Sequence, residues 1–336
     1  MRHAGRTPAF RLPSGGILPG SIAEIRYLPI GGIEQWVMIR GENLTNPVLI
    51  LVHGGPGFSE MRLFRRFNAA LEKSFTVVYW DQRGTAKSFY PDIPISSMTI
   101  EQFIADLDVL VETVRHRLGK DKVALYGHSW GSALGVLYAA RFPEKISVYV
   151  GAGQIGDLPA SERICYSFTL AEAERRGNRK ALRELRSIGP PPHTARLLMQ
   201  ERKWLTRFTG FVRGMSLWEF SRIVLSSPEC SILDLPNILR GVRFSTGTMW
   251  AEVSALDLTK AAPALRMPVF FFLGRHDHVI APEISHAYFN MLAASPKELV
   301  WFEKSAHEPP FEEPVRFNEM MSGPVRHAAL ARFHAS

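Results

Sequence analysis

The feature of this chain that most constrains its fold is the pentad Gly127-His128-Ser129-Trp130-Gly131, which stands between a predicted strand (123–126) and a predicted helix (133–141). A sharp turn from strand to helix strains the backbone of its central residue and leaves no space for side chains beside it, which accounts for the two glycines. The serine hydroxyl then projects above a sheet at the N-terminus of a helix, where developing negative charge is stabilised. Ser129 is therefore a candidate nucleophile.

The rest of the chain up to residue 157 follows the alternation that such a sheet requires. Short apolar runs recur between segments of helical periodicity, which indicates parallel strands joined by crossover helices. The run 47–52 is almost wholly apolar, as expected for a strand covered on both faces. The predicted strands are 33–40, 47–52, 75–80, 123–126, 146–150, 269–273 and 299–302, and the predicted helices are 62–73, 100–118 with Thr99 and Gly119 at its ends, 133–141, 283–292 and a last one from 314.

The length of 336 residues exceeds the size at which one hydrophobic core usually stops growing, so we expect a large domain with an inserted subdomain. Between residues 154 and 262 the strand pattern disappears, and helical segments are broken by three prolines at 190–192. The predicted organisation is a core domain at 22–153 and 263–336, a helical cap at 154–262 and an N-terminal extension at 1–21.

The formal charge of +8 raises the question of an acidic partner. The segment 154–260 holds 16 Lys and Arg against 11 Asp and Glu, and the two signs are interleaved within it. This mixture indicates a solvated helix face, and no recognition motif accompanies it. We therefore predict no nucleic-acid partner.

The two cysteines, Cys165 and Cys230, are too few for a disulfide framework and favour a cytoplasmic location. The N-terminal segment lacks the pattern of a signal peptide, and no run approaches ~18 apolar residues. We expect neither secretion nor a membrane span.

A serine hydroxyl is a weak nucleophile, so Ser129 needs a base and a carboxylate that orients this base. After a turn of this kind, the partners follow along the chain in the order acid, then histidine. The strand 269–273 leads to Asp277, and the strand 299–302 leads to His307. Because the carboxyl ends of parallel strands gather at one edge of a sheet, we predict His307 as the general base and Asp277 as the acid that holds it.

Two further features surround this predicted site. The backbone N–H groups of Gly55 and Trp130 are candidates for an oxyanion hole. Asp277 lies between His276 and His278, a run that also suggests a set of metal ligands. Alternating side chains point in different directions and no other ligand cluster is evident, so we predict no metal and no cofactor.

The chain contains the three blocks His53-Gly54-Gly55-Pro56-Gly57, Asp81-Gln82-Arg83-Gly84-Thr85-Ala86-Lys87-Ser88 and Gly127-His128-Ser129-Trp130-Gly131-Ser132. Together these blocks resemble the proline iminopeptidase branch of the α/β hydrolases. Segments 274–277 and 305–307 extend the resemblance from about residue 22 to the end of the chain, outside the detail of the cap. It implies an α/β-hydrolase fold, with a mostly parallel central sheet flanked by helices, and a cofactor-independent hydrolase that cleaves an N-terminal residue, often proline, from small peptides.

The chain departs from this family at two positions of these blocks. Ala86 stands where the second block usually has Gly, and His128 stands where many iminopeptidases have Gly. Neither position belongs to the predicted catalytic residues.

In this family, aminopeptidase activity needs carboxylates in the cap that hold the α-ammonium group of the substrate. Glu219, after Trp218, resembles a Trp-Glu pair of the family's cap, and a solvated helix position is the alternative interpretation. Glu201 and Glu252 compete for the same role. The cap aromatics that are candidates for an apolar pocket are Trp204, Phe208, Phe211, Trp218 and Trp250.

Together these observations predict a serine hydrolase that cleaves a peptide, amide or ester bond through an acyl-enzyme, with a small molecule or short peptide as substrate. An aminopeptidase of the proline iminopeptidase type is the first expectation, and an esterase or amidase acting on a hydrophobic small molecule is the alternative. The remote alternative is a protein that binds a ligand on this fold without catalysing a reaction. Epoxide and haloalkane hydrolysis are disfavoured because these reactions on this fold use an aspartate where Ser129 stands. The oligomeric state does not follow from the sequence.

Overall fold

The computed structural model describes residues 5–214, 219, 222, 223, 228, 229 and 234–331. Within this part of the chain, eight strands form one sheet in the order β1-β2-β4-β3-β5-β6-β7-β8. The last six strands along the chain are parallel, and β2 joins them antiparallel to β4, with β1 antiparallel at the edge. The predicted mostly parallel sheet is confirmed. The strands are β1 (Ile22–Ile30), β2 (Ile33–Gly41), β3 (Val48–Val52), β4 (Thr76–Trp80), β5 (Val123–His128), β6 (Ile146–Ala152), β7 (Val269–Gly274) and β8 (Lys297–Phe302).

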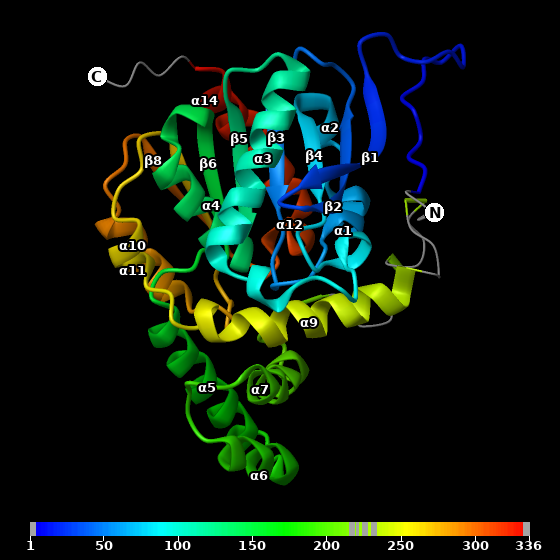
Figure 1. The fold of residues 1–336 in the computed structure, drawn as a ribbon. Coiled ribbons are helices and arrows are strands. Elements are labelled where there is room, and N and C mark those ends of the chain that lie inside the picture. Colours follow the sequence, from blue (N-terminus) through cyan, green and yellow to red (C-terminus); the bar gives the residue numbers. More distant parts are fainter. Residues whose placement is uncertain (1–4, 215–218, 220–221, 224–227, 230–233, 332–336) are drawn as a thin grey trace.

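Helices cover both faces of the sheet (Figure 1). One face packs against α3 (Ile100–Leu118), α4 (Trp130–Arg141) and α11 (Pro282–Met291). The other face packs against α1 (Met61–Phe67) and, near the end of the chain, α13 and α14. The remaining short helices of the core are α2 (Leu71–Ser74), α10 (Leu258–Ala261), α12 (Pro309–Glu312), α13 (Pro314–Met320) and α14 (Arg326–Leu330).

The position of β3 inside the sheet, between β4 and β5, explains why its sequence is apolar without interruption. Side chains of a strand point alternately to opposite faces. Accordingly, Val48, Ile50 and Val52 belong to the cluster under α3 and α4, whereas Leu49 and Leu51 belong to the cluster under α1. All five are buried, so β3 has no face that tolerates a polar residue.

Among the residues that the structure describes, four helices lie beyond the carboxyl end of the parallel strands, and α9 runs across that end (Figure 1). We call them the helical layer. The division into core, cap and N-terminal extension remains a prediction. The four helices are α5 (Leu158–Arg175), α6 (Arg179–Ile188), α7 (Ala195–Arg207) and α9 (Leu235–Val253).

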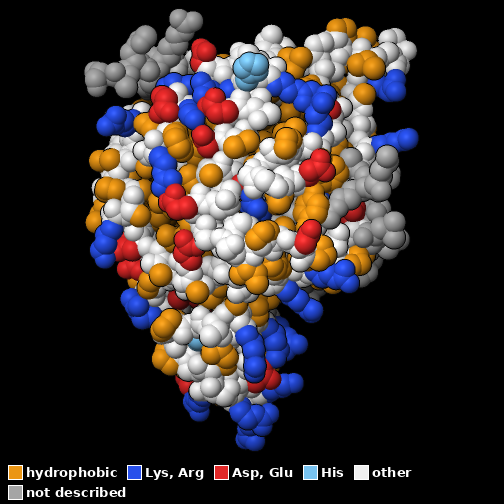
Figure 2. All heavy atoms as spheres, viewed as in Figure 1, with side chains coloured by type: hydrophobic (Ala, Val, Ile, Leu, Met, Phe, Trp, Pro, Cys, Tyr) orange, Lys and Arg blue, Asp and Glu red, His pale blue; other side chains and the backbone are white. Residues whose placement is uncertain are grey.

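Lys and Arg side chains gather over the protruding end of the helical layer, where α6 and α7 lie (Figure 2). Acidic neighbours pair with many of them. Glu172 binds Arg175 and Arg176 within α5, and Glu184 binds Lys203 across two helices. These pairs are the interleaved charges that the sequence indicated.

Two elements differ from the prediction. Strand β1 was not predicted, because it lies at the edge of the sheet and its side chains before Ile30 are exposed or half-buried, so its sequence lacks a continuous apolar run. The predicted helix 62–73 is two helices, α1 and α2, and Asn68 ends the first of them. The Asn68 side chain donates to Pro310 O at 3.0 Å, a tertiary contact that the local pattern does not contain.

The predicted ends of α3 are confirmed. The Thr99 hydroxyl accepts a hydrogen bond from Gln102 N at 3.2 Å, and Gly119 adopts the left-handed conformation with φ of 60°. Across the described residues, no helix is both long enough and apolar enough to cross a bilayer.

The end of β7 gives a test of how closely the site loops approach the sheet. A Cβ atom added to Gly274 would stand 1.8 Å from Ala306 O, so Gly274→Ala must displace the loop before His307. We expect a loss of about 1–3 kcal/mol in the free energy of unfolding. Gly247 in α9 is the control, since an added Cβ there meets no atom within 4 Å. Gly247→Ala should keep the stability or raise it by up to about 1 kcal/mol. Urea denaturation measures both, and equal stability of the two variants would contradict the close approach.

Candidate active site

Ser129 lies at the turn between β5 and α4, as its flanking glycines predicted. Its backbone has φ of 52° and ψ of −121°, a strained conformation for a residue with a side chain. A Cβ on Gly131 would stand 2.0 Å from Val52 O, so only glycine allows α4 to begin this close to β3. The turn leaves Ser129 half-buried at the carboxyl end of the sheet.

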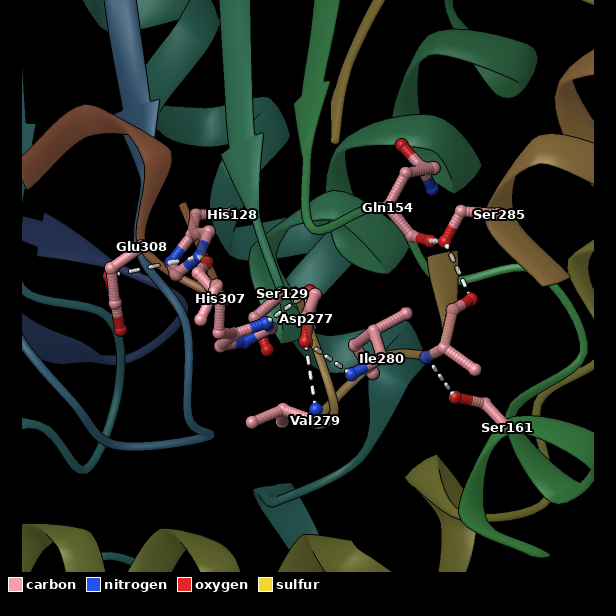
Figure 3. Close-up of polar contacts among 12 residues, drawn as sticks. His128, Ser129, Gln154, Ser161, Asp277, Val279, Ile280, Ser285, His307 and Glu308 are labelled. Carbon is pink, nitrogen blue, oxygen red and sulfur yellow. Dashed lines mark hydrogen bonds and ion pairs between the residues drawn. The ribbon is translucent and has the colours of Figure 1, made fainter. Parts of the chain in front are cut away.

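Asp277 and His307 meet beyond the ends of β7 and β8. The imidazole Nδ1 of His307 donates to Asp277 Oδ2 at 2.8 Å (Figure 3). The other oxygen, Oδ1, accepts from Val279 N at 2.8 Å and from Ile280 N at 2.9 Å. Both side chains are 98% or more buried, and the bond at Nδ1 leaves the lone pair of the neutral ring at Nε2.

A cavity of about 510 Å³ opens over Ser129 between the sheet and the helical layer. His307, Gly55 and Trp130 line it together with Ser129, so the structure brings these predicted site residues to one place. Asp277 stands behind His307. Most of the wall is apolar, and its aliphatic and aromatic members include Phe58, Ile155, Leu158, Leu198, Phe211, Val242, Trp250, Val253, Val279 and Ile280.

The aromatic residues that were candidates for a pocket divide into two groups. Phe211 and Trp250 line the cavity, and the Phe211 ring lies edge-on to His307 at 5.5 Å between centroids. Trp204 and Phe208 instead pack inside the helical layer, in a cluster with Tyr166 and other residues of α5 and α6. Trp218 lies outside the described residues.

The predicted cap carboxylates do not line this cavity. Glu219 is exposed and borders a separate hollow near Arg66. Glu201 is buried and binds Thr169 and Arg202, and Glu252 accepts a hydrogen bond from Ile100 N at the start of α3.

Three other carboxylates do line the cavity, and the sequence analysis did not name them. They are Glu60, Glu162 and Glu308. Glu162 forms an ion pair with Arg202, which also pairs with Glu201. The sequence does contain a signal for Glu60 and for Glu308. Glu60 follows the glycine-rich loop, and Glu308 directly follows His307.

His128, the departure from the family pattern, joins three loops of the site. Its Nδ1 donates to Glu60 Oε1 at 2.6 Å. Its Nε2 donates to His307 O at 2.8 Å, and Figure 3 shows His128 beside His307 and Glu308. Glu60 Oε1 also accepts from Gly54 N at 2.9 Å. Both ring nitrogens face oxygen atoms, an arrangement that suits an imidazolium, whose two N–H groups both donate.

The charges around His128 agree with this protonation state. Burial by itself lowers the pKa of His128, but the carboxylates of Glu60 and Glu308 outweigh burial and raise it to about 10. Burial raises the pKa of Glu308 to about 7, and the charge of His128 opposes that rise. His128 is therefore charged at neutral pH.

Two sets of side chains in the chain are of the types that bind metal ions. His276 and His278 flank Asp277, and the His278 ring stacks on Phe168 with 3.4 Å between centroids. Within the described part of the chain, the one group of three side chains with ligand atoms close together is Glu60, His128 and Glu308. Both nitrogens of His128 already donate to oxygen atoms, so the ring offers no lone pair to a metal ion.

Comparisons with known proteins agree with this geometry. Family models match for the alpha/beta hydrolase fold at residues 47–184 and for serine aminopeptidase, S33, at residues 220–314. The probable aminopeptidase YbaC of Bacillus subtilis (strain 168) is 33% identical over 312 residues, which cover 91% of this chain and 98% of that protein. A proline iminopeptidase of Clostridioides difficile (strain 630) is 26% identical over 88% of this chain and 96% of its own length. The crystal structure of a proline iminopeptidase from Mycobacterium smegmatis has a TM-score of 0.68 and 18% identity, covering 92% of this chain and all of that one, and it supports the fold alone.

A parallel sheet with a serine turn at the end of β5 and an acid and a histidine at the ends of β7 and β8 defines the class of the α/β hydrolases, to which this chain belongs. Within that class it is a hydrolase of the proline iminopeptidase type, as the sequence blocks predicted.

The two donors of His128 can be separated by substitution. Gln at position 128 places an amide nitrogen near the Nε2 position and keeps a donor for His307 O, whereas Asn places it near Nδ1 and faces Glu60. We expect kcat/KM for an aryl ester to fall about tenfold in His128→Gln and about a hundredfold or more in His128→Asn, because only the latter leaves the His307 loop without its donor.

His116→Gln, on the exposed side of α3, is the control and should keep the activity of the unchanged protein. Equal losses in His128→Gln and His128→Asn would show that the bond to the His307 loop has no special role.

Proposed function

We propose that Ser129, His307 and Asp277 form a catalytic triad that hydrolyses its substrate through an acyl-enzyme. The supporting observation is the 2.8 Å hydrogen bond from His307 to Asp277, with His307 and Ser129 on the wall of one cavity. His307 Nε2 takes the proton of the Ser129 hydroxyl as the oxygen attacks the carbonyl carbon, and then gives it to the leaving group. Asp277 fixes the tautomer of the imidazole and stabilises the imidazolium.

The tetrahedral intermediate needs donors for its negative oxygen. We assign this role to the backbone N–H groups of Gly55 and Trp130, which border the same cavity as Ser129. Gly54 N is already held by Glu60, and this bond fixes the loop that carries Gly55. Water attacks the acyl-enzyme in the second half of the reaction, with His307 again as the base.

The substrate that fits best is a short peptide whose free N-terminal residue, such as proline, is released. The relatives named aminopeptidase and proline iminopeptidase support this substrate class. The cavity volume suits a small molecule, and its apolar wall suits a small hydrophobic side chain. We assign no cofactor, nucleic acid or membrane partner to this reaction, and we place it in the cytoplasm on the grounds of cysteine usage.

We propose that residues 154–262 act as a cap on a core domain at 22–153 and 263–336, with an extension at 1–21. In support of the cap, α5, α7 and α9 all contribute side chains to the cavity wall. The substrate then reaches Ser129 between the cap and the sheet.

The second candidate is an esterase or amidase that acts on a hydrophobic small molecule. The apolar majority of the cavity wall favours it, because such a wall binds an acyl chain without any charged group. Binding without turnover is the remote alternative.

The triad is tested with an active-site-directed fluorophosphonate and a substrate panel. We expect the reagent to label Ser129, Ser129→Ala to abolish labelling, and Asp277→Asn to lower kcat by roughly 10⁴, because the imidazole then adopts the wrong tautomer. Prolyl arylamides and aryl esters should both be cleaved. Cleavage of esters alone would exclude the peptidase activity, and absence of labelling at Ser129 would favour the binding protein.

A further inference from the structure

Glu308 is a buried carboxylate on the wall of the proposed active site that receives no hydrogen bond from any described residue. It is 5% exposed, and its Oε2 is buried without a partner. A buried carboxylate is unfavourable unless a donor or a positive charge satisfies it. We propose that Glu308, supported by Glu60, binds the α-ammonium group of the substrate's N-terminal residue. This inference rests on the proposed function of the same site.

The charge balance of the cluster calls for one more cation. Glu60 and Glu308 bring two negative charges, and His128 between them brings one positive charge. Both protons of His128 are engaged, one by Glu60 and the other by His307 O. His128 Nε2 stands 3.8 Å from Glu308 Oε2, so it compensates part of the charge of Glu308 without donating to it. An ammonium group supplies both the missing charge and the missing donors.

The position of the cluster suits an aminopeptidase. In an N-terminal residue, the ammonium group is separated from the scissile carbonyl carbon by one carbon atom, so its binding group must lie beside the nucleophile. A Cβ on Gly54 would stand 2.9 Å from Glu60 Oε1 and 3.3 Å from Ser129 Cβ, so these two residues are neighbours across Gly54. The rings of His128 and His307 are 4.8 Å apart between centroids.

The helical layer offers one competing carboxylate. Glu162 lines the cavity, but it already accepts a hydrogen bond from Arg202, as does Glu201. Its Oε1 is thus engaged by a guanidinium group, which distinguishes Glu162 from Glu308. The carboxylates expected in the cap for this task are therefore replaced by residues of the loops beside Ser129 and His307.

Titration provides a second readout. Burial, together with the charges of Glu60 and Glu312, raises the pKa of Glu308 to about 7, and the charges of His128 and His307 oppose the rise. The group binds an ammonium only as the carboxylate, and a free α-amino group loses its charge near pH ~8. Preference for a free amine should therefore decline as the pH falls below about 7 and as it rises above about 8.

The experiment compares two substrates that differ in the ammonium group alone. We take the full chain with prolyl and cyclopentanecarbonyl esters of the same phenol, which share ring size and leaving group. The ratio of their kcat/KM values cancels any loss of activity that affects both esters equally. We expect the unchanged protein to prefer the prolyl ester at least ~100-fold, and Glu308→Gln to reduce this ratio at least ~30-fold, mainly through KM.

Two matched Glu→Gln variants serve as controls. Glu303→Gln, at an exposed ion pair with Arg275, should keep the ratio, and Glu162→Gln should affect both esters to the same extent. A ratio near one in the unchanged protein, an equal loss for both esters in Glu308→Gln, or a selective loss in Glu162→Gln would overturn the inference. The second of these outcomes assigns Glu308 to the electrostatics of His307.

Failure of the proposed function is distinguishable from failure of this inference. If prolyl arylamides resist cleavage while the esters react, the peptidase activity is wrong, yet the ester ratio still measures ammonium binding. If the Glu308→Gln variant does not react with fluorophosphonate, its kinetics cannot be used. The experiment then compares competitive inhibition of the unchanged protein by prolinamide and by cyclopentanecarboxamide. Inhibition by prolinamide that does not weaken between pH 7 and pH 6 then counts against Glu308.

Discussion

The whole site depends on the hydrogen bond between His307 and Asp277 and on the sheet that makes it possible. Parallel strands end at one edge, so residues that lie 30 positions apart along the chain meet beyond β7 and β8. Asp277 is fixed in turn by the backbone N–H groups of Val279 and Ile280, which leave its Oδ2 directed at the imidazole. A side chain held from both oxygens has little freedom, and catalytic geometry requires that restriction.

His128 connects two loops of the site to each other. One imidazolium connects the loop after β3, through Glu60, with the backbone of the His307 loop. The ring is itself next to Ser129 in the chain. A glycine at this position would form neither bond, so it is the buried imidazolium that joins these loops in this chain. Burying such a group requires that both neighbouring carboxylates remain close.

Local pattern and the topology of a parallel sheet were enough to predict the strands and turns that build the site. The strand that ends in the glycine-rich loop, the turn at Ser129 and the order of Asp277 and His307 needed no knowledge of side-chain contacts. Strand β1 and the break at Asn68 escaped because one is an edge strand with little apolar signal and the other depends on a contact with Pro310. The carboxylates that line the cavity were not predicted for a related reason. Whether Glu60 or Glu219 lies beside Ser129 is decided by packing between distant segments, and no periodicity in the sequence records it.

The buried acids also explain how an apolar cavity can be selective. A wall of aliphatic and aromatic side chains binds many small acyl groups with similar strength, and one methylene more or less changes binding only modestly. A carboxylate without a donor destabilises the empty site and stabilises a complex in which an ammonium group reaches it. Ligands that lack this group leave the carboxylate unsatisfied, so discrimination comes from what the wrong ligand fails to provide. Glu308 and Ser129 line the same cavity, so we expect an ammonium group held by Glu308 and Glu60 to orient the N-terminal residue for attack by Ser129.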